Sequence, residues 1–201
     1  IGLLLQGDLR AAQAAFRQVT ELEPDYVDGW VNLGRAALAE GDLDGAAAAL
    51  TEARRLEPDL ARTNFFLGLH AKALGDYDAA LQLLQVAAEQ YPKDRVVRNQ
   101  MARVYFLKRD YGAAIAELDA VFAIDPEDLM AHYTAMLAYR GVGDLERSAH
   151  HQTLYERFKA DEASQVLTGE YREAHPHDNN ERQSVHEHST VPYAEIESFP
   201  K

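Results

Sequence analysis

The 201-residue sequence contains no cysteine. Disulfides, zinc–thiolate sites and covalent haem attachment are therefore excluded within these residues. The sequence also lacks a run of about 18 apolar residues, which a membrane-spanning helix needs. Lysine and arginine are few, 20 against 33 aspartates and glutamates, so the net charge is −13. This excess of negative charge argues against nucleic acid and anionic membrane as partners.

The common catalytic signatures are absent as well. The sequence has no glycine-rich phosphate loop, no His-Glu-x-x-His motif, no nucleophile elbow and no cysteine nucleophile. No pair of carboxylates is held opposite another in a recognisable cleft. We therefore expect a protein that is not an enzyme.

A regular repeat runs through most of the chain. Prolines recur every 34 residues, at Pro24, Pro58, Pro92 and Pro126. Gly-Asp dipeptides keep the same register at Gly7, Gly41, Gly75 and Gly143, and Arg109-Asp110 takes the remaining place. A fixed period of this length predicts a solenoid, in which each unit buries its apolar face against its neighbours.

Each unit contains two amphipathic stretches on either side of the Gly-Asp turn. The register gives a half repeat 1–26 followed by four complete repeats, 27–60, 61–94, 95–128 and 129–162. Apolar residues follow helical spacing. In the first complete repeat, Gly41 supplies the positive φ that ends one helix and Asp42 caps the next. Pro58 then ends the second helix, because it lacks an N–H.

Small residues recur where the paired helices must approach closely: Gly34, Gly68 and Ala102 in the first helices, and Ala46, Ala80 and Ala114 in the second. The last repeat departs from this pattern with Met136 and Ser148, as a terminal repeat does. Among the large apolar residues, we expect Trp30, Leu67 and Leu118 to be buried in the core.

This pattern resembles the tetratricopeptide repeat family over residues 1 to about 160. The first complete repeat matches the family signature at Trp30, Leu33, Gly34, Ala46, Leu50, Ala53 and Pro58. The resemblance implies an all-α, right-handed superhelical solenoid of antiparallel helix pairs, with the first helix of each pair lining a concave face. It also implies a non-catalytic scaffold that binds peptides or assembles complexes.

The first helices, roughly 27–40, 61–74, 95–108 and 129–141, are basic. They carry eight lysines and arginines and only two acidic residues, Asp28 and Glu40. By the family's geometry the basic residues that point inward are Arg35, Arg62, Lys72, Arg103 and Arg140. The same predicted face carries Phe65, Phe66, Leu69, Phe106 and Tyr133.

Arginine forks beside aromatic rings predict a groove for an extended, acidic and partly apolar peptide, or for a neighbouring subunit. The alternative is that these charges only solvate exposed helix faces while the aromatic residues fill the core. The family's clamp for a chaperone C-terminus is not predicted, because Val31, Phe65 and Asn99 stand where it needs polar or basic residues.

The C-terminal segment 161–201 has a different composition. We expect a short helix and then an extended tail with His175, His177, His186 and His188. Each His-x-His pair would place two imidazoles about 7 Å apart on one side of an extended chain, a workable geometry for a transition metal or haem. An ordinary polar tail is the alternative. His150 and His151 are expected on the exposed side of the last helix.

The tail faintly resembles those of bacterial tetratricopeptide proteins that occur with multihaem cytochromes. This resemblance implies a second function, an accessory subunit of a redox assembly, with haem supplied by a cytochrome partner. From residue 159 onward the chain has nine acidic and four basic residues. We therefore expect this segment to dock on its own solenoid or, slightly favoured, on an adjacent subunit. Since the chain begins at Ile1 within a repeat, we expect a longer protein. Its compartment stays open, with export slightly favoured over the cytoplasm.

Overall fold

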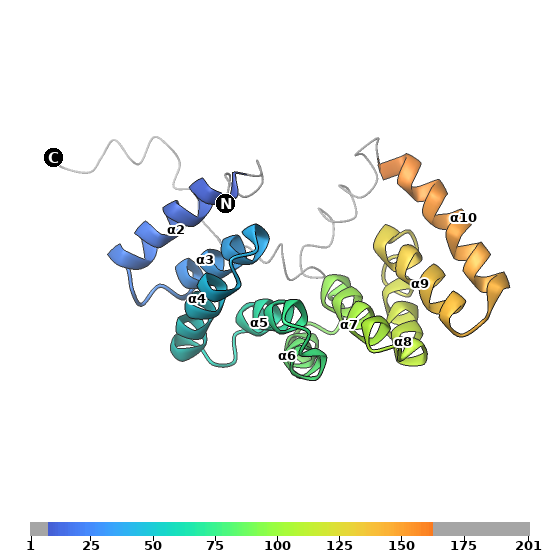
Figure 1. Ribbon diagram of the computed structural model, residues 1–201, viewed down its shortest axis with the longest axis horizontal. Coiled ribbons are helices and arrows are strands. Elements are labelled where there is room, and N and C mark those ends of the chain that lie inside the picture. The colour runs from blue at the N-terminus through green and yellow to red at the C-terminus, as the bar shows by residue number, and fades with distance from the viewer. Residues whose placement is uncertain (1–7, 163–201) are drawn as a thin grey trace, which may run out of the picture.

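The protein folds into an arch of α-helices (Figure 1). The computed structural model describes residues 8–162, and this part contains helices and no strands. The helices are α2 (Leu9–Leu22), α3 (Val27–Glu40), α4 (Leu43–Leu56), α5 (Ala61–Ala73), α6 (Tyr77–Gln90), α7 (Arg95–Leu107), α8 (Tyr111–Phe122), α9 (Leu129–Gly141) and α10 (Leu145–Glu162). The predicted all-α solenoid is confirmed.

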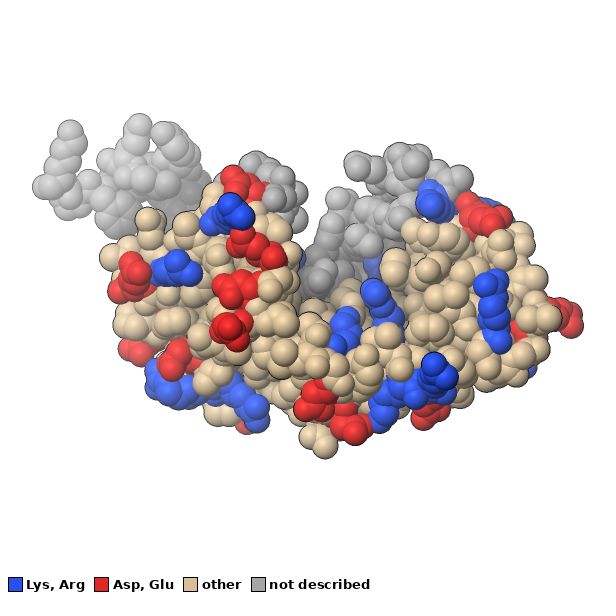
Figure 2. Space-filling model, viewed as in Figure 1, with Lys and Arg blue, Asp and Glu red and all other residues tan. Residues whose placement is uncertain are grey.

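The odd-numbered helices line the inside of the arch. Each of α3, α5, α7 and α9 packs against the helix that follows it. The odd-numbered helices also contact one another in order, α3 with α5, α5 with α7 and α7 with α9. In Figure 1 these helices border the hollow between the two arms, which Figure 2 shows as a concavity in the upper edge. We call this surface of α3, α5, α7 and α9 the inner face. Among the described helices, none has the length and apolar character required to cross a bilayer.

The turns within the helix pairs follow the predicted chemistry. Gly41, Gly75 and Gly143 adopt φ values of 86°, 81° and 82°, which a side chain disfavours. Arg109 takes the equivalent place in the third complete repeat with φ of 62°, so this turn accepts a conformation uncommon for a non-glycine residue. The aspartate after each turn caps the next helix. Asp42 Oδ1, for example, accepts the Gly45 N–H at 2.9 Å.

The repeat prolines have a second structural role. The carbonyl of each accepts a hydrogen bond from the side chain six residues further on, at 2.8 to 3.2 Å: Trp30 to Pro24, Asn64 to Pro58, Arg98 to Pro92 and His132 to Pro126. Four different residue types therefore perform one task, which is to tie the start of an odd-numbered helix to the turn before it.

Close contact between the two helices of a pair requires the small residues. A Cβ atom at Gly34 would lie 2.5 Å from Leu50 Cγ, and one at Gly68 would lie 2.9 Å from Leu84 Cγ. In the last pair the Ser148 hydroxyl donates to the Met136 carbonyl at 2.8 Å, so the polar residue there forms an interhelical hydrogen bond. In these three pairs, a small residue at the crossing point of the two helices allows them to pack closely.

The core runs along the solenoid between the helix layers. Leu50, Leu84 and Leu118 are at most 1% exposed, which confirms the prediction for Leu118. The prediction for Trp30 and Leu67 is wrong. Both are half-buried and pack against the edge of the core. Trp30 lies at this edge because its indole N–H must reach the exposed Pro24 carbonyl.

The packing at Gly34 predicts opposite effects for one substitution at two helical glycines. Gly34→Ala should lower the free energy of unfolding by about 1–3 kcal/mol, because the new methyl group overlaps Leu50. Gly112→Ala should be neutral or raise it by up to about 1 kcal/mol, because a Cβ atom there would meet only Asp110 Oδ1, at 3.9 Å. Urea unfolding followed by circular dichroism measures both. Equal stability of the two variants would contradict the packing argument.

Candidate functional site

Seven of the eight basic residues that the sequence places on the first helices lie on α3, α5, α7 and α9, and Lys108 directly follows α7. Half of the eight are held by the protein's own carboxylates. Arg62 of α5 forms an ion pair with Asp28 of α3, and Lys108, directly after α7, forms one with Asp78. Arg98 Nη1 lies 3.0 Å from Glu117 Oε2. Arg62, predicted to bind a partner, is therefore already engaged within the fold.

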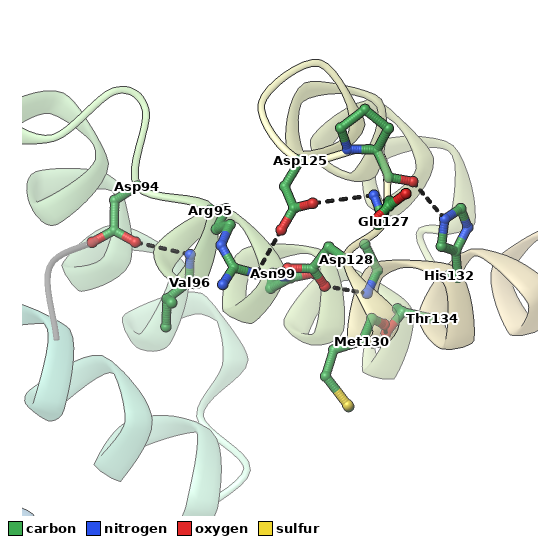
Figure 3. Close-up of polar contacts among 12 residues, drawn as sticks. Asp94, Arg95, Val96, Asn99, Asp125, Glu127, Asp128, Met130, His132 and Thr134 are labelled. Atoms are coloured by element: carbon green, nitrogen blue, oxygen red, sulfur yellow. Dashed lines mark hydrogen bonds and ion pairs between the residues drawn. The ribbon is translucent and has the colours of Figure 1, made fainter. Parts of the chain in front are cut away.

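Arg95 is the most deeply held of these cations (Figure 3). Its guanidinium pairs with Asp128 and lies 3.2 Å from an Asp125 carboxylate oxygen. Asp128 also accepts from Asn99 Nδ2 at 3.1 Å and caps α9 through the Ala131 N–H at 2.8 Å. Because Arg95 and Asp128 are both buried, this network joins α7 to α9 and is closed to a ligand.

The other four basic residues have no ion pair with a carboxylate in the described part of the chain. They are Arg35, Lys72, Arg103 and Arg140. The Arg35 guanidinium lies over the Phe66 ring, 5.9 Å from its centroid. Arg103 and Arg140 are exposed. These four side chains come from the four odd-numbered helices, one from each, and all lie in the C-terminal halves of those helices.

Lys72 is half-buried, as is Arg35. The Lys72 Nζ atom donates to Gln100 Oε1 of α7 at 2.5 Å. Burial, and then repulsion from Arg103, lower the pKa of Lys72 to about 8. By contrast, the hydrogen bond from Lys108 to the Asp78 carboxylate raises the pKa of Lys108 above its ordinary value. The two lysines differ because only Lys108 has an anion beside it.

The apolar residues predicted for the groove differ in exposure. Phe65 and Phe66 are 1% and 7% exposed and pack edge-to-face, so their predicted place in the groove is wrong. Leu69 and Phe106 are half-buried. Tyr133 is 39% exposed. Met130, three residues earlier on α9, is 43% exposed, and the sequence analysis did not predict it as a site residue.

Sequence reasoning assigned Phe65 and Phe66 to the groove because a helical period identifies a face only to within about one residue. Their two rings instead belong to the hydrophobic core, where Arg35 of α3 lies over the ring of Phe66. Met130 was not predicted as a site residue because it is neither charged nor aromatic. Its only sequence signal is its register, 34 residues after Val96 and 68 after Arg62.

A separate hollow of about 350 Å³ lies at the N-terminal ends of α3 and α5. It is lined by Asp25, Tyr26, Val27, Asp28, Glu57, Leu60 and Arg62. Three carboxylates against one arginine make this hollow acidic. The N-terminal ends of α3 and α5 are therefore acidic, whereas Arg35 and Lys72 lie in the C-terminal halves of the same two helices.

Family models for the tetratricopeptide repeat match residues 3–61, 38–95 and 71–138. The chain belongs to the tetratricopeptide repeat family. Its fold is therefore that of a protein–protein interaction scaffold, in which the odd-numbered helices are the first helices of the tetratricopeptide repeats. Comparison with the curated proteins gave no significant sequence match.

Several solved structures share the tetratricopeptide fold. A crystal structure of MamA has a TM-score of 0.68 at 21% identity, covering 81% of this chain and 95% of that chain. MamA 41-end from Desulfovibrio magneticus RS-1 has a TM-score of 0.69 at 18% identity, with 79% and 90% covered. A chain of the APC/C hetero-tetramer Cut9-Hcn1 has a TM-score of 0.70 at 21% identity, with 79% and 32% covered. At these identities the likeness concerns the fold.

The histidines predicted to bind a metal or haem, His175, His177, His186 and His188, lie outside the described residues, and so does the predicted docking of the tail. Both ideas stay predictions. Within the part of these tetratricopeptide repeats that the structure describes, no group of three or more histidine, aspartate or glutamate side chains could hold a metal ion.

Two other histidines join the last two helices. His132 is buried, and its Nε2–H donates to the Pro126 carbonyl, so the Nδ1 atom of the neutral ring is an acceptor. That atom lies 2.9 Å from His151 Nδ1, which must then carry the proton. His151 was predicted to be exposed, but it is half-buried between stacked rings. Those rings are Phe122, His132 and Tyr139, at centroid distances of 4.6 to 5.3 Å within the stack.

The pair resists full protonation because two N–H groups would then face each other. Burial lowers the pKa of His132, and burial together with the charges of His132, His150 and Arg147 lowers that of His151 to about 4. In the unfolded chain a histidine titrates near pH 6.5. Below that pH the unfolded state binds more protons than the folded state, so stability falls as the pH drops from about 6.5 toward 4.

We therefore predict that the free energy of unfolding falls by roughly 1–2 kcal/mol between pH 7.5 and pH 5 because of this pair. The double variant His132→Asn, His151→Phe should lose much less over the same range. Asparagine keeps a donor for Pro126, as Asn64 does for Pro58, and phenylalanine keeps a stacked ring. Urea unfolding at the two pH values measures the difference. The same pH dependence in both proteins would show that the pair does not titrate as described.

Proposed function

We propose that the protein is a non-catalytic scaffold whose inner face binds an extended, acidic and partly apolar segment of a partner protein. The proposal rests on a difference among the eight basic residues of the first helices, because four of them have a carboxylate partner in the described part of the chain and four do not. Arg35, Lys72, Arg103 and Arg140 have no carboxylate partner among the described residues, although acidic residues outnumber basic ones by 33 to 20 in the chain.

The four basic residues suit a carboxylate-rich ligand. An arginine guanidinium can donate two parallel hydrogen bonds to one carboxylate, and such charged bonds are stronger than neutral ones. Because α3, α5, α7 and α9 lie side by side, their basic residues form a row across the repeats. A row of this kind fits an extended chain that crosses several helices.

Apolar contact is available beside this row. Tyr133 and Met130 are exposed on α9, and Leu69 is half-buried on α5. An exposed tyrosine offers a large, rigid contact area and a hydroxyl group, which favours it at interfaces. A ligand with aromatic or aliphatic side chains between its acidic residues would use both kinds of contact.

The acidic hollow sets the position of this ligand. Asp25 and Glu57 at the N-terminal ends of α3 and α5 would repel a negatively charged segment. The acidic part of the ligand therefore lies across the C-terminal halves of the odd-numbered helices, where the unpaired basic residues are.

A synthetic nonapeptide that alternates glutamate with tyrosine and leucine, amidated at its C-terminus, tests the proposal. The triple variant Arg35→Gln, Arg103→Gln, Arg140→Gln should bind it at least about tenfold more weakly than the natural chain, because each lost charged contact weakens binding. Isothermal titration calorimetry measures the dissociation constants.

The matched control is Arg17→Gln, Arg54→Gln, Lys93→Gln. These exposed residues lie on α2, on α4 and in the turn before α7, and their replacement removes the same amount of charge. We expect less than about a threefold change for it. Equal weakening of peptide binding in both triple variants would show that only the net charge of the protein matters, and would contradict a specific role of the inner face. An absence of peptide binding by the natural chain would contradict the proposed function.

A further inference from the structure

Lys72 and Arg103 are two positive groups on neighbouring helices, and neither forms an ion pair with a carboxylate of the described residues. Lys72 reaches from α5 to Gln100 of α7, and Arg103 follows Gln100 by three residues, so both lie on one side of α7. The Gln100 amide satisfies one N–H of the ammonium group but neutralises neither charge. This arrangement is electrostatically unfavourable unless an anion joins it.

The surroundings of Lys72 offer no anion from the described residues. On α3, Asp28 is engaged by Arg62 and Glu40 by Arg10. The basic Arg35 of the same helix lies over Phe66. On α6, Asp78 is engaged by Lys108, and α4 contributes a backbone carbonyl, Leu43 O, to His70. On α7 the charged neighbour is Arg103 itself, whose repulsion adds to burial in favouring the neutral amine.

We propose that Lys72 and Arg103 together bind one side-chain carboxylate of the ligand and that Lys72 takes up a proton as this carboxylate binds. The inference rests on the proposed function, since it assigns one subsite of the inner face. The ammonium group donates to one carboxylate oxygen while the guanidinium donates to the other. The bound anion then adds two attractions, which offset the repulsion between the two cations.

The consequence is a dependence of affinity on pH that an ordinary basic groove lacks. In the free protein the pKa of Lys72 is about 8, so at pH 9 the amine is mostly neutral. The bound carboxylate favours the charged form and returns its pKa toward the ordinary range near 10.4. Proton linkage then makes binding about tenfold weaker at pH 9 than at pH 7.

The experiment measures binding of the amidated nonapeptide to the full chain at pH 7 and pH 9. The natural protein should lose about tenfold in affinity, and Lys72→Arg should lose little, because arginine stays charged at both pH values. Lys108→Arg is the matched control. It alters the other lysine, which already contacts Asp78, and should keep the pH dependence of the natural protein. A peptide with glutamines and a free C-terminus tests whether a terminal carboxylate is bound instead.

Equal affinity at the two pH values, or the same loss in Lys72→Arg as in the natural chain, would overturn the subsite while leaving peptide binding intact. Equally tight binding of the glutamine peptide would overturn the proposal that the subsite binds a side-chain carboxylate. Nuclear magnetic resonance of the Lys72 side chain provides a readout that needs no peptide. N-acetylglutamate α-amide should raise the Lys72 pKa, and N-acetylglutamine amide should not. An unchanged pKa with both compounds would also overturn the inference.

Discussion

The close approach of the two helices in each pair is the constraint on which the rest of the structure depends. Gly34 and Gly68 leave room for Leu50 and Leu84, which are fully buried between the helices. This contact fixes the even-numbered helices behind the odd-numbered ones. The odd-numbered helices are then free to contact one another and form the inner face. The side chains that reach this face are therefore selected by packing at positions remote from it.

The eight basic residues of the first helices of the repeats serve two purposes. Arg62, Arg95, Arg98 and Lys108 hold neighbouring parts of the solenoid together through carboxylates from the same chain. Arg95 and Asp128 illustrate the structural role most clearly, since both are buried and also cap and join helices. The remaining four basic residues are not used in this way, which is why the functional proposal rests on them and not on all eight.

The repeat could be predicted from the sequence because its turns depend on local chemistry. Gly41 and Asp42 form the expected turn and cap since positive φ and a capping carboxylate act over a few residues. The orientation of side chains was less predictable. Phe66 and His151 were assigned to the surface, yet both lie between helices, because burial depends on the angle at which two helices pack. The hydrogen bond to each proline carbonyl could not be predicted either. Its donors are tryptophan, asparagine, arginine and histidine, which share no sequence signal beyond a polar N–H.

The most direct test of the central claim is to map, by photo-cross-linking, the place where an acidic ligand contacts the protein. A photoreactive benzoylphenylalanine can replace Tyr133 on the inner face or Leu22 on α2, both exposed at 39% and 82%. The account predicts that the acidic nonapeptide cross-links to the chain labelled at position 133, that excess unlabelled peptide suppresses this, and that position 22 gives no product. Cross-linking at position 22 alone, or equally at both positions, would contradict the claim that the inner face is the binding surface.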